Sequence, residues 1–258
     1  MENFTFFNPT RIEFGTGKEQ TIGQHLAAHG IRKVLLCYGS ERIKREGLFD
    51  VASKSLAEKG IEWIEFGGIV SNPVISKVRE GIALARAHQV DAILSVGGGS
   101  VLDSVKAIAA GVCHDGDVWD LFVGKADIES ARPVFAILTL AATGSEMNSS
   151  AVVTNDETQE KFFISAAPLF PRVSIVNPAL MQGVSRDYLV YSASDVIAHL
   201  IETSAQSDES RHMTLGLEAI KFLLEQDEDN VPIIQDWIDK WFWRAYRMSA
   251  LVAGMMDY

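Results

Sequence analysis

The chain has 258 residues, of which 47% are apolar and 22% charged, a composition that excludes an intrinsically disordered protein and provides enough apolar side chains for a large core. The 34 acidic residues outnumber the 23 basic ones, and the resulting net charge of −11 has the wrong sign for a nucleic-acid-binding protein. No apolar run is long enough to cross a bilayer, and the N-terminus lacks the basic start and apolar core of a signal peptide. With two cysteines, each in or beside an apolar run, we expect a cytoplasmic protein with no membrane partner.

The first part of the chain alternates short strands with helices. We expect strands at 33–38, 61–66, 91–96, 134–140 and 173–178, and helices at 47–60, 74–88 and 100–112. This alternation is typical of βαβ units around a parallel sheet, and the nearly continuous apolar runs at 92–96 and 134–140 indicate strands covered on both faces. We therefore predict an α/β fold in which residues 1–182 form a doubly wound, parallel-sheet dinucleotide-binding domain.

From about Ser185 the strand pattern stops, and three helical stretches follow. We predict that residues 183–258 form an all-helical domain. Its last helix carries large apolar residues on many sides, among them Trp237, Trp241 and Trp243. Such a helix needs neighbours, so it packs on the first domain or on a partner chain, or the helical domain is incomplete. We expect a homodimer.

The sharpest motif is a glycine loop, Gly97, Gly98, Gly99 and Ser100, which follows a buried strand and opens a helix. Glycines let the backbone come close enough to a phosphate for its N–H groups to bind it, and the helix N-terminus adds a favourable dipole. A tight turn is the alternative, but three consecutive glycines exceed what a turn needs. Ser100 and Asp103 also have the spacing of a capping box.

A second candidate site follows the strand at 33–38. In dinucleotide folds an acidic residue there binds the ribose 2′-hydroxyl, whereas small residues with nearby cations admit a 2′-phosphate. The chain has Gly39 and Ser40 at this place, followed by three cations, Arg42, Lys44 and Arg45. This pattern favours NADP(H) over NAD(H). Glu41 weakens the argument, and the cations are alternatively one solvated helix face.

A third segment, 139–153, follows another apolar strand. Its polar side chains either grip a nucleotide or cap a turn, and they are Thr139, Thr143, Ser145 and Asn148.

A fourth candidate is a possible metal site. Asp195 and His199 have the i, i+4 spacing that puts a carboxylate and an imidazole on one helix face, where both can bind one divalent ion. Glu202 lies one turn beyond. The alternative is an ordinary hydrogen bond on the helix surface.

Taken in order, these motifs resemble the iron-dependent (group III) alcohol dehydrogenase family. The likeness covers about four fifths of the chain and is closest to the NADPH-dependent butanol dehydrogenase and aldehyde reductase branch. It rests on the segments 7–17, 66–73, 92–103, 139–148, 161–178 and 194–202.

The resemblance implies roles for individual residues. Gly97 to Ser100 would hold the pyrophosphate, Asp103 would lie near the nicotinamide, and Lys161 would reach the cofactor beside the active site. Nucleotide contacts are implied for Asn72, Thr139, Thr143 and Asn148. Asp195 and His199 match the first two metal ligands, with Fe²⁺ or Zn²⁺ as the ion. The ion would polarise the substrate oxygen while hydride passes between nicotinamide and carbonyl carbon.

The sequence also departs from this family. Family members continue past residue 258 and supply two further histidine ligands, whereas no histidine follows His212 here. Asn177 stands where the family usually has Asp. Two hypotheses follow. The chain is an NADP(H)-dependent enzyme that interconverts primary alcohols and aldehydes, or it is a truncated member that binds NADP(H) without turnover.

Overall fold

The computed structural model describes residues 7–183, 185–187, 190, 193–194 and 197. The chain divides into two compact units, Met1–Gly183 and Val184–Tyr258. Most of the second unit lies outside the described residues, so the predicted helical domain stays a prediction, and the fold below is that of the first unit.

Six parallel strands form the central sheet in the order β1-β8-β5-β4-β2-β3. Their bounds are β1 (Arg11–Phe14), β2 (Lys33–Tyr38), β3 (Glu62–Phe66), β4 (Ala92–Gly97), β5 (Val134–Leu138) and β8 (Val173–Val176). Val34 of β2 lies opposite Ala92 of β4, and Ile93 of β4 lies opposite Val134 of β5. The predicted doubly wound α/β fold is confirmed.

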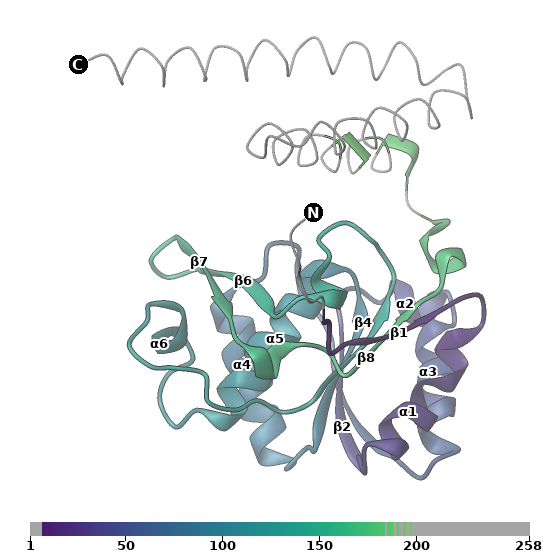
Figure 1. Ribbon diagram of the computed structural model, residues 1–258, viewed down its shortest axis with the longest axis horizontal. Helices are drawn as coiled ribbons and strands as arrows, with labels where there is room; N and C mark the ends of the chain where they lie inside the picture. The colour runs from purple at the N-terminus through teal and green to yellow at the C-terminus, as the bar shows by residue number, and fades with distance from the viewer. Residues whose placement is uncertain (1–6, 184, 188–189, 191–192, 195–196, 198–258) are drawn as a thin grey trace, which may run out of the picture. The chain divides into compact units, whose positions relative to one another are not determined.

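Helices cover both faces of this sheet (Figure 1). On one face lie α1 (Ile22–Ala28) and α3 (Leu48–Ala57), and on the other α4 (Ile75–Ala87) and α5 (Gly99–Cys113). Alternate residues of β2 enter the two cores, Val34 and Leu36 beside α1 and α3, Leu35 and Cys37 beside α4 and α5. Every residue of β4 and β5 is buried, as the apolar runs predict.

The remaining elements are short. They are the 3-10 turns Lys18–Thr21, Ser145–Met147, Ala167–Leu169 and Pro178–Met181, the helices α2 (Arg42–Arg45) and α6 (Trp119–Phe122), and the antiparallel strands β6 (Ser150–Asn155) and β7 (Glu160–Ser165). The β6–β7 hairpin lies beside α4, α5 and α6 (Figure 1).

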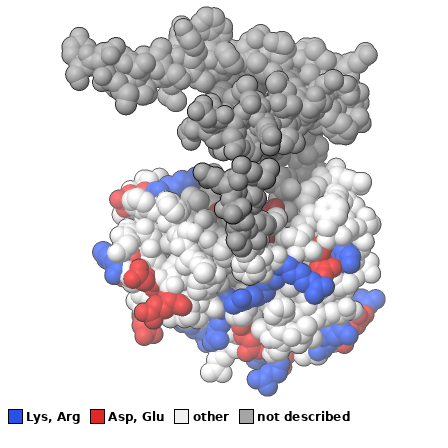
Figure 2. Space-filling model, in the orientation of Figure 1, with Lys and Arg blue, Asp and Glu red and all other residues white. Residues whose placement is uncertain are grey.

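Surface charges of both signs are interspersed on the face shown in Figure 2. Within the described part of the chain, no helix has the length and apolar character needed to cross a membrane.

Candidate functional site

The predicted cofactor residues follow the ends of neighbouring strands. The chain leaves β2 toward β3 and leaves β4 toward β5, so the strand order changes direction between β2 and β4. Gly39 follows β2, Gly98 follows β4 and Thr139 follows β5, at what we call the carboxyl edge of the sheet. Open α/β sheets bind ligands at such a switch point. The candidate site is therefore the carboxyl edge around β2, β4 and β5.

The glycine loop joins β4 to α5, and none of its three glycines has the left-handed backbone that favours glycine. At two of these positions a side chain would clash with neighbouring atoms, so glycine is required there. A Cβ atom at Gly97 would lie 2.5 Å from Cγ2 of Val101, and one at Gly99 would lie 2.3 Å from Oγ1 of Thr143. Gly98 is partly exposed. Packing thus explains Gly97 and Gly99, and Gly98 leaves the backbone open to a ligand.

The first turn of α5 has free donors. The N–H groups of Val101 and Leu102 bond to the carbonyl of Gly98, whereas those of Gly99 and Ser100 meet no acceptor among the described residues. Free N–H groups at the N-terminus of a 15-residue helix attract an anion. The loop therefore fits the pyrophosphate predicted for it.

The predicted capping box of Ser100 and Asp103 is wrong. α5 begins at Gly99 without a side-chain cap. Oδ1 of Asp103 instead accepts from Oγ of Ser145 at 2.7 Å, and Oδ2 accepts from the N–H of Val152 at 3.1 Å. Burial raises the pKa of Asp103 above its ordinary value. Asp103 thus ties α5 to the segment after β5, and its predicted place near the nicotinamide stays a prediction.

Lys106 lies one turn further along α5 and is completely buried. Its Nζ atom is within hydrogen-bond distance of Ser145 O (2.7 Å), Ser145 Oγ (2.9 Å), Asn148 O (2.8 Å), Asn148 Oδ1 (3.0 Å) and Ser150 O (2.9 Å). Burial lowers the pKa of this ammonium to about 8, against the opposing effect of the Asp103 and Glu146 carboxylates. Sequence reasoning missed Lys106, although a lysine inside an otherwise apolar helix pattern was a signal.

The three predicted nucleotide contacts after β5 lie on one segment. The N–H of Thr139 donates to the carbonyl of Gly97 at 3.0 Å and so continues the sheet beyond β5. Thr143 is exposed. The side-chain oxygen of Asn148 already accepts from Lys106. The nucleotide contacts of these three residues stay predictions. For Asn148, the side-chain oxygen is already used in the hydrogen bond with Lys106.

Lys161 and Asn72 come together although 89 positions separate them. Nζ of Lys161, on β7, donates to Oδ1 of Asn72 at 3.3 Å. Asn72 has a φ of 55°, a left-handed conformation that asparagine tolerates better than most residues. Burial raises the pKa of Asp103, and the positive charge of Lys161 is among the influences that oppose this rise. These predicted residues therefore share one neighbourhood.

Exposed polar contacts fix the tip of the β6–β7 hairpin. Arg79 of α4 donates to both carboxylate oxygens of Asp117, from Nε at 2.9 Å and from Nη2 at 3.0 Å, and Nη1 donates to Glu157 at 3.1 Å. Oγ of Ser76 donates to Asp156 at 2.6 Å. Since Asp156 and Glu157 form the hairpin turn, α4 positions the strand that carries Lys161.

We expect Arg79→Met to loosen the hairpin and leave the core intact. The pairs are partly exposed, so the free energy of unfolding should fall by less than about 1 kcal/mol. Amide exchange in β6 and β7 should become several-fold faster, measured by hydrogen–deuterium exchange with mass spectrometry. Lys77→Met is the matched control, because Lys77 pairs with Glu80 inside the same helix. Unchanged exchange in Arg79→Met would contradict the assignment.

Two of the cations after β2 are paired with carboxylates. Nε of Arg42 donates to Glu46 at 2.6 Å. Nζ of Lys44 lies 3.2 Å from Oε2 of Glu41 and also bonds to Glu65. The predicted attraction for a 2′-phosphate is therefore weakened at both positions.

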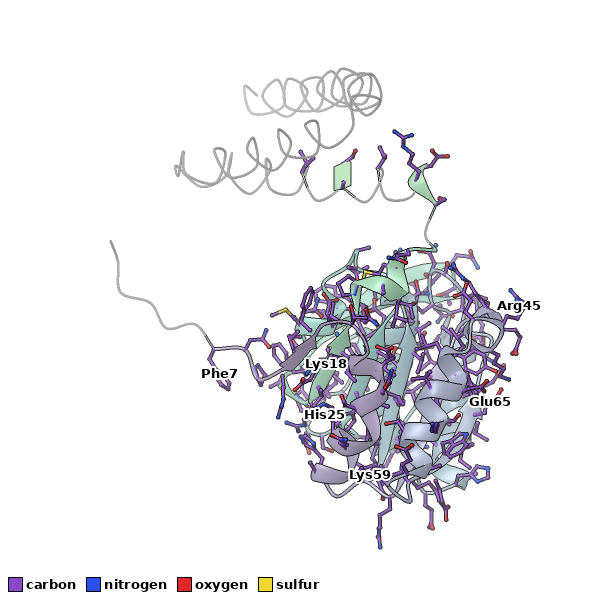
Figure 3. The ribbon with its side chains drawn as sticks, turned by 90° about the vertical axis from the view of Figure 1, so that its right-hand side faces the viewer. Phe7, Lys18, His25, Arg45, Lys59 and Glu65 are labelled. Atoms are coloured by element: carbon purple, nitrogen blue, oxygen red, sulfur yellow. The ribbon has the colours of Figure 1, made fainter. Side chains whose placement is uncertain are left out.

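Gly39 and Ser40 occupy the turn itself. A Cβ at Gly39 would lie 3.1 Å from the carbonyl oxygen of Ile69, and Ser40 is exposed. The third cation, Arg45, points away from the sheet on the outer flank of the unit (Figure 3).

Asn177 follows β8 and is buried beside Glu19. Its Nδ2 donates to Oε2 of Glu19 at 2.9 Å, and its Oδ1 accepts from the N–H of Ala179 at 2.9 Å. The amide of Asn177 offers a donor and an acceptor at once, which an ionised carboxylate cannot do, and this gives a physical reason for asparagine rather than aspartate here.

The predicted metal ligands Asp195 and His199 lie outside the described residues. Among the residues that the structure describes, no three His, Cys, Asp or Glu side chains gather as a metal site.

Comparison with known proteins gives consistent matches. Residues 9–178 match the family model of iron-containing alcohol dehydrogenases. The chain is 46% identical to the probable NADH-dependent butanol dehydrogenase 2 of Bacillus subtilis, over 78% of this chain and 52% of that protein. It is 34% identical to the NADPH-dependent aldehyde reductase YqhD of Escherichia coli, again over 78% and 52%.

A solved structure matches as well. The NADH-dependent butanol dehydrogenase A of Thermotoga maritima superposes with a TM-score of 0.75 and 49% identity, over 78% of this chain and 51% of that one. The chain thus spans about half the length of the relatives it matches.

Proposed function

Because the chain belongs to the iron-containing alcohol dehydrogenase family, we propose that it binds a nicotinamide dinucleotide at the carboxyl edge and takes part in interconverting primary alcohols and aldehydes. One observation carries this proposal. The glycine loop presents the N–H groups of Gly99 and Ser100, which no acceptor in the described part of the chain engages, at the switch point between β2 and β4.

In this proposal the protein binds and orients the reactants. The N–H groups in the first turn of α5 would hold the pyrophosphate, and Gly98 would give it access to the backbone. Thr143 lies against Gly99 and closes one side of the loop. Lys161, oriented by Asn72, supplies a positive charge toward the bound cofactor. The nicotinamide, when bound, supplies hydride transfer.

A divalent ion, Fe²⁺ or Zn²⁺, held by Asp195 and His199 belongs to the proposal as the Lewis acid for the substrate oxygen. Both residues lie outside the described part of the chain, so no geometry enters here.

The choice between NADP(H) and NAD(H) depends on the turn after β2. The predicted NADP(H) preference stays a prediction, and the pairing of Arg42 and Lys44 with carboxylates argues for NAD(H). Both choices occur in the names of relatives, NADH-dependent in Bacillus subtilis and NADPH-dependent in Escherichia coli.

We expect Glu41→Ser to shift the preference toward NADPH. The substitution removes a negative charge beside Ser40 and releases one partner of Lys44. Loss of one repulsion at a partly solvated site should lower the Kd ratio of NADPH to NADH by about three- to tenfold. Fluorescence titration of both nucleotides measures it. Glu62→Ser, which removes the same charge at the start of β3, should leave the ratio unchanged. An equal shift in both variants would show only an effect of net charge.

The proposed function is tested by two measurements on the same protein. The first is fluorescence titration with NADH and NADPH. The second is butanal-dependent oxidation of each nucleotide after metal is removed and Fe²⁺ or Zn²⁺ is restored. Binding with metal-restored turnover supports the enzyme. Binding without turnover supports the alternative, a family member that binds the nucleotide but does not catalyse the reaction. Failure to bind either nucleotide overturns the proposal.

A further inference from the structure

Lys106 is a buried cation of α5 that follows the glycine loop in sequence without belonging to it. Its side chain comes from the second turn of α5, among the buried apolar residues Val105, Ala107 and Ile108. An ammonium group in such surroundings is costly unless its N–H groups are satisfied. Among the described residues, the oxygens within hydrogen-bond distance of its Nζ atom come from the segment Ser145–Ser150.

The contacts of Lys106 span a segment that has little regular structure. Between β5 and β6, only Ser145–Met147 forms a short 3-10 turn. One ammonium collects backbone oxygens of Ser145, Asn148 and Ser150, which lie 39, 42 and 44 positions away in sequence. Charge-assisted hydrogen bonds of this kind are stronger than neutral ones. Lys106 is thus the centre around which this segment folds.

The same segment is connected to the glycine loop. Oγ of Ser145 accepts from Lys106 and donates to Asp103. The N–H of Ser145 donates to Oγ1 of Thr143 at 3.3 Å, and Thr143 lies against Gly99. A continuous chain of contacts therefore runs from the buried ammonium to the first turn of α5.

Resting on the proposed function, we propose that Lys106 is a positioning residue of the dinucleotide site. Its ammonium holds Ser145–Ser150 in place, which holds Thr143 against the glycine loop and sets the affinity for the cofactor. Lys106 itself does not touch the cofactor, because its donors are directed at the segment and its side chain is buried.

The test compares Lys106→Met with a matched control, Val105→Ala. Methionine keeps the length of the side chain and removes the charge and the donors. Val105 is equally buried in α5 and its side chain has no hydrogen-bonding group, so its truncation lowers stability without removing a hydrogen bond to the segment. We expect the Kd for NADH to rise at least tenfold in Lys106→Met and less than twofold in Val105→Ala. In the nucleotide-free protein, the amides of Ser150 and Val152 should exchange faster only in Lys106→Met.

A double-mutant cycle shows whether Lys106 acts through the segment. Asn148→Ala removes one acceptor and should weaken NADH binding about threefold. In the Lys106→Met background the same change should have no further effect, because coupled residues are not additive. Full additivity would overturn the inference. If Lys106→Met does not fold, Asn148→Ala decides alone, and the amide to follow is that of Val152, which bonds to Asp103 and not to Asn148. Faster exchange at Val152 with weaker binding supports the inference, and unchanged exchange or binding overturns it.

The outcomes separate this inference from the proposed function. If the wild type binds neither NADH nor NADPH, the proposed function fails and the inference fails with it. If the wild type binds and Lys106→Met binds equally well, only the inference fails.

Discussion

Gly98→Val should fold like the wild type and bind NADH at least a hundredfold more weakly. Gly98 has an extended backbone, with φ −87° and ψ −168°, which valine adopts readily. Its Cβ would lie 3.2 Å from Cβ of Leu140, so a shift of a few tenths of an ångström relieves the contact. The branched side chain would then occupy the partly exposed part of the loop, where the pyrophosphate must approach the backbone. A hundredfold loss corresponds to about 2.7 kcal/mol of binding free energy.

Gly97→Val is the control for Gly98→Val, because it should affect folding stability instead of nucleotide binding. Gly97 is buried, and a Cβ there would lie 2.5 Å from Cγ2 of Val101. Overpacking of this kind should cost about 3 kcal/mol or more of folding stability. Thermal unfolding and NADH titration thus separate the two glycines, since one variant loses stability and the other loses binding. If Gly98→Val bound NADH with wild-type affinity, the proposal that the glycine loop binds the pyrophosphate would be refuted.

Asn177→Asp should destabilise the protein in a pH-dependent way. The change keeps the oxygen that accepts from Ala179 and replaces the donor to Glu19 by a second carboxylate oxygen. Two buried carboxylates at this distance share one proton, so one pKa in the folded state is raised above its unfolded value. The folded state then binds more protons, and stability falls as the pH rises. At pH 8 we expect a loss of about 2 kcal/mol, or roughly 4–8 °C in Tm, that shrinks toward pH 5.

The double variant Glu19→Gln with Asn177→Asp tests the cause. It restores a donor–acceptor pair with the direction reversed, so most of the stability should return and the added pH dependence should vanish. Thermal unfolding between pH 5 and pH 8 measures both effects. A double variant as unstable as Asn177→Asp would show that the pair is not the reason.

The sequence predicts best what depends on local apolar patterning. Strands β2, β4 and β5 are recognised because buried parallel strands are apolar almost throughout, and the carboxyl edge follows from where they end. The β6–β7 hairpin was not predicted, because its strands lack a clear apolar pattern. In β6 the buried Ala151, Val153 and Asn155 alternate with half-buried residues, but their types do not alternate between apolar and polar.

Side-chain roles in the site were harder to predict, because distant partners decide them. Spacing alone predicts a capping box for Ser100 and Asp103, yet Ser145 and Val152 offer Asp103 better-placed donors from 42 and 49 positions away. Lys106 was missed because its acceptors are mostly backbone carbonyls, which leave no pattern in the sequence. The glycine loop was recognised because positions where other atoms come close to the backbone require glycine, and glycine is visible in the sequence.

The position of β1 has a consequence for synthesis of the chain. In the described structure β1 is an edge strand that pairs with β8, so Arg11–Phe14 must wait until Val173–Val176 leaves the ribosome. The gap is about 160 residues, which at about 5–20 residues per second corresponds to roughly 8–30 s. During this time β1 lacks its partner strand, although β2 to β5 and their partners in the sheet are synthesised. The sheet is therefore completed last at the edge where the chain began.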